Sequence, residues 1–141
     1  MNILISACLL GQYCRYDGKT KCYEQIKRLL KRDDIHLIPV CPEQAGGLAT
    51  PRPAAERQGK RVVNSEGLDV TAQYRRGAEA ALYWAKLFHC TKAILKEKSP
   101  SCGHGQIYDG TFSRTLTAGD GVAAELLRAA GIEIIGERDL L

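Results

Sequence analysis

Short, continuously apolar runs alternate along the chain with longer segments in which apolar residues recur every three or four positions. The apolar runs cover residues 2–7, 35–40, 92–95 and 132–135. The segments with helical spacing cover residues 21–32, 71–90 and 120–130. Continuous apolar runs are typical of strands buried on both faces of a parallel sheet. The pattern predicts an α/β fold, a three-layer Rossmann-like domain with a mostly parallel central sheet of about four or five strands.

The ends of the predicted helices carry recognisable signals. Asp69 or Thr71 is expected to begin the longest helix. Asp120 is expected to begin the last helix, and Gly131 is expected to end it. Two stretches rich in glycine or proline are expected to be loops for the most part. They cover residues 41–59 and 98–121.

The composition indicates one globular domain. The chain has 141 residues, of which 45% are hydrophobic and 26% are charged, and this is enough apolar material for one core. We expect a single domain over residues 1–141. The net charge of +4 is compatible with a small anionic ligand, yet it is too low to indicate nucleic-acid binding.

Six cysteines in 141 residues raise the question of disulfide bonds. Disulfide scaffolds are typically short, secreted and poor in core, whereas this chain has a core. The apolar residues 3–10 are not preceded by Lys or Arg, as they would be in a secretory signal. No run approaches the roughly 18 apolar residues of a membrane span. We therefore expect a cytoplasmic protein, without membrane contact, whose cysteines bind metal or carry out chemistry.

Three cysteines follow three different predicted strands. Cys8 comes after the first strand, Cys41 after the second, and Cys102 lies in the loop after the third. Ligands of an open parallel sheet bind beyond the carboxyl ends of its strands, so we expect these thiols to meet at one edge. Each lies near Gly or Pro, which lets the backbone approach an inorganic group closely. Three thiolates leave one coordination position open for a substrate.

The other three cysteines have different surroundings. Cys22 and Cys90 fall on predicted helix faces, where a cysteine most often serves as a small core residue. Cys14 lies in a polar loop, and its role stays open at this point.

Polar residues near these cysteines are candidates for binding and proton transfer. Glu43 could move a proton for an attacking water, or it could be a loop glutamate paired with Arg52. Ser99 and Ser101 could donate hydrogen bonds or relay a proton, although loop serines usually make turns. The planar guanidinium of Arg52 would suit a carboxylate or phosphate, so Arg52 and Ser99 are candidates for substrate binding. His104 could be a fourth ligand or a plain loop residue.

A series of short motifs runs through nearly the whole chain in a fixed order. They are Ser6-Ala7-Cys8-Leu9-Leu10-Gly11, Arg15-Tyr16-Asp17-Gly18, Val40-Cys41-Pro42-Glu43 with Gly46-Gly47-Leu48, Pro51-Arg52-Pro53, Gly67-Leu68-Asp69-Val70-Thr71, and Leu95-Lys96 with Ser99-Pro100-Ser101-Cys102-Gly103. Together they resemble the thiouracil desulfidase family, also known as domain of unknown function 523. Larger relatives carry a second domain, so this chain is similar to the stand-alone, single-domain form.

The resemblance implies a [4Fe–4S] cluster held by Cys8, Cys41 and Cys102, with one iron not ligated by the protein. That iron would bind the sulfur of a thiolated pyrimidine such as 2-thiouracil, 4-thiouracil or a thiouridine nucleoside or nucleotide. The C–S bond would be cleaved without net redox change, giving a uracil-type product and hydrosulfide. The acid–base carboxylate of the family would be Glu43, and its neighbouring serine would be Ser101.

Two other functions remain open from the residues alone. The first is a zinc-dependent hydrolase in which the same cysteines, with or without His104, surround a zinc-activated water. The second is a non-catalytic iron–sulfur or sulfur-carrier module. Such a module would serve a partner. For the desulfidase, the expected partner is a small thiolated pyrimidine rather than nucleic acid, and the chain is expected to be a monomer or homodimer.

Overall fold

The computed structural model describes residues 1–20 and 23–140. Within these residues, one four-stranded sheet forms the centre of the molecule, with the strand order β2-β1-β5-β8. The strands are β1 (Asn2–Ser6), β2 (His36–Val40), β5 (Lys92–Leu95) and β8 (Glu133–Gly136). Every neighbouring pair is parallel. The carboxyl ends of all four strands therefore lie at the same edge of the sheet.

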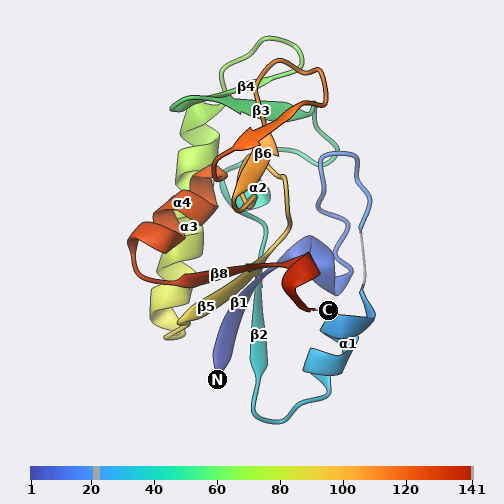
Figure 1. Ribbon diagram of the computed structural model, residues 1–141, viewed down its shortest axis with the longest axis vertical. Coiled ribbons are helices and arrows are strands. Elements are labelled where there is room, and N and C mark those ends of the chain that lie inside the picture. Colours follow the sequence, from blue (N-terminus) through green and yellow to red (C-terminus); the bar gives the residue numbers. More distant parts are fainter. Residues whose placement is uncertain (21–22, 141) are drawn as a thin grey trace.

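Helices cover both faces of this sheet. On one face lie α3 (Thr71–Leu87) and α4 (Val122–Ala129), and on the other lie α1 (Glu24–Leu30) and the 3₁₀ helix η1 (Ala7–Leu10). Figure 1 shows α3 and α4 to the left of the sheet and α1 to its right.

The side chains of β1 alternate between these two layers. Leu4 packs in the cluster formed with α3 and α4, whereas Ile3 and Ile5 pack with Ile26 of α1. The three-layer α/β architecture with a parallel sheet is confirmed.

Helix α3 is long because its apolar residues form one continuous stripe. Tyr74, Ala78, Ala81 and Ala85 are buried. Gly77 lies in the same stripe, and a Cβ atom there would lie 1.8 Å from the carbonyl oxygen of Pro42. Gly77 thus lets the short helix α2 (Pro42–Ala45) pack directly on α3.

Two small hairpins lie beyond the carboxyl edge of the sheet (Figure 1). Strands β3 (Ala55–Gln58) and β4 (Arg61–Asn64) form the first, and β6 (Gln106–Tyr108) and β7 (Leu116–Ala118) form the second. The prediction that residues 98–121 form a loop is wrong for the residues of β6 and β7. These strands are short and partly exposed, so they lack the apolar run that reveals a buried strand.

Of the two signals at the ends of the last helix, the structure contradicts the one at Asp120 and contains the one at Gly131. Helix α4 begins after Gly121, and Asp120 does not cap it; its side chain accepts a hydrogen bond from the Gly105 amide at 2.9 Å and pairs with Arg128 at 3.1 Å. Gly131 follows the end of the helix with a φ of 86°, as expected for a left-handed stop.

The remaining signals concern α3 and the first helix. The Asp69 carboxylate accepts a hydrogen bond from the Thr71 amide at 2.9 Å, so Asp69 satisfies the first backbone donor of α3. The first helix is described from Glu24, and the expectation for Cys22 lies outside the described residues.

No helix in 1–20 or 23–140 is both long enough and apolar enough to cross a membrane.

Candidate active site

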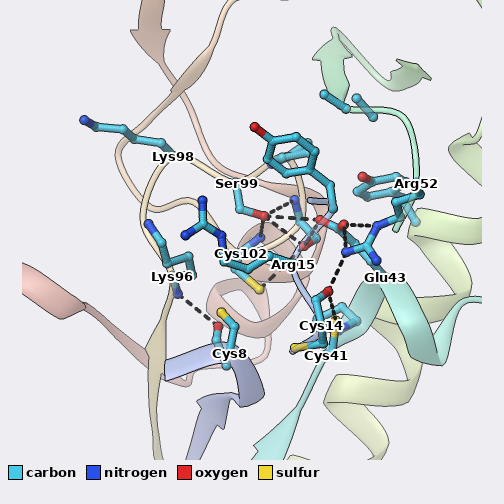
Figure 2. A pocket seen from close by; sticks show the side chains of 18 of the residues that line it. Cys8, Cys14, Arg15, Cys41, Glu43, Arg52, Lys96, Lys98, Ser99 and Cys102 are labelled. Carbon is cyan, nitrogen blue, oxygen red and sulfur yellow. Dashed lines mark hydrogen bonds and ion pairs between the residues drawn. The ribbon is translucent and has the colours of Figure 1, made fainter. Parts of the chain in front are cut away.

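The three cysteines predicted to meet do lie in one cavity. Cys8 is in η1 directly after β1, Cys41 lies between β2 and α2, and Cys102 is in the loop after β5. Because β1 lies between β2 and β5, the three loops are neighbours at the carboxyl edge. Figure 2 shows these side chains around a common space, with Cys14 beside Cys41.

The cavity has a volume of about 570 Å³, which is the size of a typical small-molecule site. Its wall combines thiols, a carboxylate, hydroxyls, cations and aromatic rings. These residues include Cys8, Cys14, Cys41, Cys102, Glu43, Ser99, Ser101, Arg15, Arg52, Lys96, Lys98, Arg114, Tyr16, Tyr74, Tyr108 and Phe112. Among the described residues, no group of three or more His, Cys, Asp or Glu side chains is gathered tightly enough to hold a single metal ion.

Cys14 is a fourth thiol of this cavity, and its place could not be read from the sequence. It is 1% exposed and lies next to Cys8 and Cys41. Hydrogen bonds between its thiol and the sulfurs of Cys41 and Cys8 raise the pKa of Cys14 above its ordinary value. The same contacts lower the pKa of Cys8 and that of Cys41, the latter to about 7. Cys14 therefore holds its proton more firmly than Cys8 and Cys41 hold theirs.

The pKa of Cys102 is raised, whereas the pKa values of Cys8 and Cys41 are lowered. Complete burial raises its pKa to about 12, against the opposing effect of hydrogen bonds from Ser6 and Ser101. A thiol in such a place ionises only when a metal replaces its proton and compensates the charge. Cys102 is therefore suited to be a metal ligand rather than a free nucleophile.

Glu43 is buried on α2, and its two carboxylate oxygens have different partners (Figure 2). Oε2 accepts a hydrogen bond from Arg52 Nε at 2.7 Å and also pairs with Arg52 Nη2. Oε1 accepts a hydrogen bond from Ser101 Oγ at 3.1 Å, and Ser99 Oγ lies 3.5 Å away. One oxygen is thus held by the guanidinium, while the other faces two hydroxyl groups.

All five N–H groups of Arg52 have partners in the protein. Nη1 donates to the Ala49 carbonyl at 3.1 Å and to Thr50 Oγ1 at 3.0 Å. Nη2 donates to the Cys14 carbonyl at 2.9 Å and forms an ion pair with Glu43 Oε2, which also accepts a hydrogen bond from Nε. Arg52 therefore connects Glu43 with two separate loops.

The two serines organise the loop before Cys102. Ser99 Oγ accepts hydrogen bonds from the backbone amides of Ser101 and Cys102, both at 3.1 Å. Ser101 is 2% exposed, and its hydroxyl lies 3.5 Å from Cys102 Sγ. Gly121 permits this packing, because a Cβ atom there would lie 2.4 Å from the Ser101 carbonyl carbon. Ser101 therefore lies between Glu43 and Cys102.

The structure also gives the places of His104, for which two alternatives were open, and of Tyr74, which was expected in the core. His104 contacts Arg128, and its Nδ1 lies 3.7 Å from Asp120. Tyr74 lines the cavity from α3, and burial, with a further contribution from Glu43, raises its pKa. The helical spacing of Tyr74 is that of a core residue, so it contained no signal for a site.

The carboxyl edge of this α/β domain thus brings together thiols, a clamped carboxylate and paired serines, and thiolates are ligands that suit zinc or an iron–sulfur cluster. A family model described as 2-thiouracil desulfurase matches residues 3–139, and the chain belongs to this family. The family resemblance of the sequence motifs is confirmed.

Two relatives extend this match over the whole chain. The uncharacterized protein YbbK of Bacillus subtilis (strain 168) is 43% identical, and the match covers 98% of this chain and 97% of that protein. A solved structure of the [4Fe-4S]-dependent thiouracil desulfidase TudS is 48% identical, with a TM-score of 0.93, over 99% of this chain and 92% of the TudS chain. These similarities support a desulfidase with an iron–sulfur cluster.

Proposed function

We propose that this protein is an iron–sulfur-dependent desulfidase that removes sulfur from a thiolated pyrimidine by hydrolysis, without net redox change. The observation that carries the proposal is the contact series from Arg52 through Glu43 and Ser101 to Cys102. It places a buried hydroxyl directly beside a candidate ligand sulfur and a buried carboxylate one hydrogen bond further away. The similarity to TudS and the family match support the same chemistry.

The donor set fits a [4Fe–4S] cluster held by Cys8, Cys41 and Cys102, with one iron free of protein ligands. The thiols of Cys8 and Cys41 have lowered pKa values and therefore ionise more readily than ordinary thiols. Cys14 is better suited to donate its proton to their sulfurs than to act as a fourth ligand, because those contacts raise its pKa. When bound, such a cluster supplies a Lewis-acidic iron that polarises the C=S bond and accepts the leaving sulfur.

The protein residues would handle the protons of this hydrolysis. Replacing C=S by C=O with one water yields hydrosulfide and one proton, so no electron acceptor is needed. Glu43 Oε1 takes the proton of the attacking water, since Oε2 is held by Arg52. The Ser101 hydroxyl, which donates to Oε1 in the structure, can turn to a ring nitrogen as its electron density changes.

The volume and the lining of the cavity support a small-molecule substrate rather than a macromolecule. Among the described residues its wall has five cationic side chains, Arg15, Arg52, Lys96, Lys98 and Arg114, and three carboxylates, Glu43, Glu56 and Glu97, which leaves a surplus of positive charge. The guanidinium of Arg52 is already occupied by protein groups. This wall accommodates a free base such as 2-thiouracil or 4-thiouracil, and its charge also suits a thiouridine monophosphate. Ser99 is placed to contact such a ligand, since its hydroxyl lies beside Glu43.

The test is a sulfide-release screen under strict anaerobiosis. Protein reconstituted with iron and sulfide, and a zinc-loaded sample, are each given 2-thiouracil, 4-thiouracil, 4-thiouridine and 4-thiouridine monophosphate. We expect about four irons and four sulfides per chain, and release of hydrosulfide with the uracil-type product. Activity of the zinc form alone would favour the hydrolase alternative. Bound iron with no turnover of any of the four compounds would favour the carrier alternative.

A further inference from the structure

Phe112 is an aromatic side chain that the fold presents to the cavity rather than to the core. It lies between β6 and β7, lines the same cavity as the cysteines, and is 39% exposed. Ligand cavities are lined largely by hydrophobic and aromatic side chains, so an aromatic ring held in the wall of this cavity can form part of a ligand surface.

The backbone of this segment is strained. Phe112 has a φ of 57° and Arg114 has a φ of 60°, both in the left-handed region that disfavours residues with a Cβ atom. Asn or Gly would adopt this conformation at lower cost. Strain of this kind persists where the surrounding contacts enforce it, and it concentrates at ligand-binding segments.

Strand β3 holds the segment in place. The Glu56 Oε1 atom accepts hydrogen bonds from the Gly110 amide at 3.0 Å and from the Phe112 amide at 3.1 Å. Gln58 donates to the Gly110 carbonyl at 2.9 Å, and a Cβ atom on Gly110 would lie 2.7 Å from the Gln58 side chain. The orientation of Phe112 toward the cavity is therefore imposed by a neighbouring strand.

We propose that Phe112 is the surface on which the pyrimidine ring of the substrate stacks. This proposal rests on the proposed function and deepens it. Glu43 and Ser101 offer polar groups, which bind the edge of a flat ring. The aromatic side chains of the wall can cover its face, and among Tyr16, Tyr74, Tyr108 and Phe112 only Phe112 has no hydroxyl group. An aromatic side chain binds the face of any base, because every base has a π surface.

The proposal is tested with Phe112→Leu, Phe112→Gly and, as a matched control, Leu116→Ala. Leu116 is an exposed apolar residue of the same hairpin. For the reconstituted enzyme with 2-thiouracil, we expect Phe112→Leu to raise KM roughly tenfold, with kcat changed less than about twofold. Leu116→Ala should leave both constants unchanged.

Phe112→Gly separates binding from structure. Glycine adopts the left-handed conformation without strain. The Tm and the iron content of this variant should therefore equal or exceed those of the native protein, while its KM rises. A purely structural role would instead lower Tm and activity together. An unchanged KM in Phe112→Leu, with the native enzyme active, overturns the stacking proposal alone. A native enzyme that releases no sulfide from any thiolated pyrimidine overturns the proposed function itself.

Discussion

Arg52 binds the carboxylate of Glu43 through one oxygen and leaves the other to Ser101. The guanidinium contacts Oε2, whereas Oε1 accepts the Ser101 hydrogen bond at 3.1 Å. A carboxylate with one oxygen clamped cannot rotate, so its second oxygen keeps a defined position toward the cavity. Proton transfer depends on such positioning, so changes at Glu43 and at Arg52 should both reduce turnover.

Glu43→Gln keeps the shape of the side chain and removes its ability to take a proton. We expect kcat for 2-thiouracil to fall about 100-fold or more, because general-base catalysis contributes at least that factor. Iron content should stay at the native level, as Glu43 is not expected to bind the metal. The exposed Glu79→Gln on α3 is the control. Native turnover in Glu43→Gln would remove Glu43 from the chemistry.

Arg52→Lys retains the charge and loses the fork that reaches several acceptors at once. We expect kcat to fall by roughly tenfold with little change in KM, because the substituted residue acts through Glu43. In Arg52→Ala, added guanidinium should restore part of kcat. Should KM rise for 4-thiouridine monophosphate while kcat is kept, Arg52 would be a substrate anchor instead.

Replacing single cysteines by serine distinguishes ligands from packing residues. Iron and sulfide analysis after anaerobic reconstitution should show loss of the cluster in Cys8→Ser, Cys41→Ser and Cys102→Ser. Cys90→Ser should load normally, since Cys90 packs in the core and is not among the residues that line the cavity. Cys14→Ser should also retain iron. Loss of iron in Cys14→Ser would make Cys14 a fourth ligand.

The cysteines of the metal-free protein should differ in their pH dependence of alkylation. Only the thiolate reacts, and its fraction rises with pH until the pKa is passed. Cys41 has a pKa of about 7, so its rate with iodoacetamide should level off above about pH 8. Burial raises the pKa of Cys90, whose rate should still increase there. Peptide mass spectrometry measures both, and parallel curves for the two cysteines would contradict the assignment.

Gly77 determines how closely α2 approaches α3. In Gly77→Ala, the new Cβ atom would lie 1.8 Å from the Pro42 carbonyl oxygen, so α2 must move with Cys41 and Glu43. We expect a loss of about 1–3 kcal/mol in the free energy of unfolding, together with reduced iron loading. Urea denaturation and iron analysis test both effects. Glu79→Ala, on the exposed face of the same helix, should change neither.

Much of the site could be predicted because parallel strands share one edge. The loops that directly follow β1, β2 and β5 must lie near one another at this edge. The sequence was therefore enough to predict that the loops of Cys8, Cys41 and Cys102 meet. The hairpins beyond that edge could not be predicted, since their partly exposed strands have no apolar run. Their existence matters here, because the second one carries Phe112.

The sequence by itself determined the alternating α/β architecture, the family, and which three cysteine loops meet. These follow from local apolar periodicity and from motifs, and both are properties of neighbouring residues. Only the tertiary structure decided that Cys14 and Tyr74 line the cavity and that the whole guanidinium of Arg52 is used within the protein. A buried residue has the same spacing whether it faces the core or a cavity. The difference arises from side chains far apart in the sequence packing around one space.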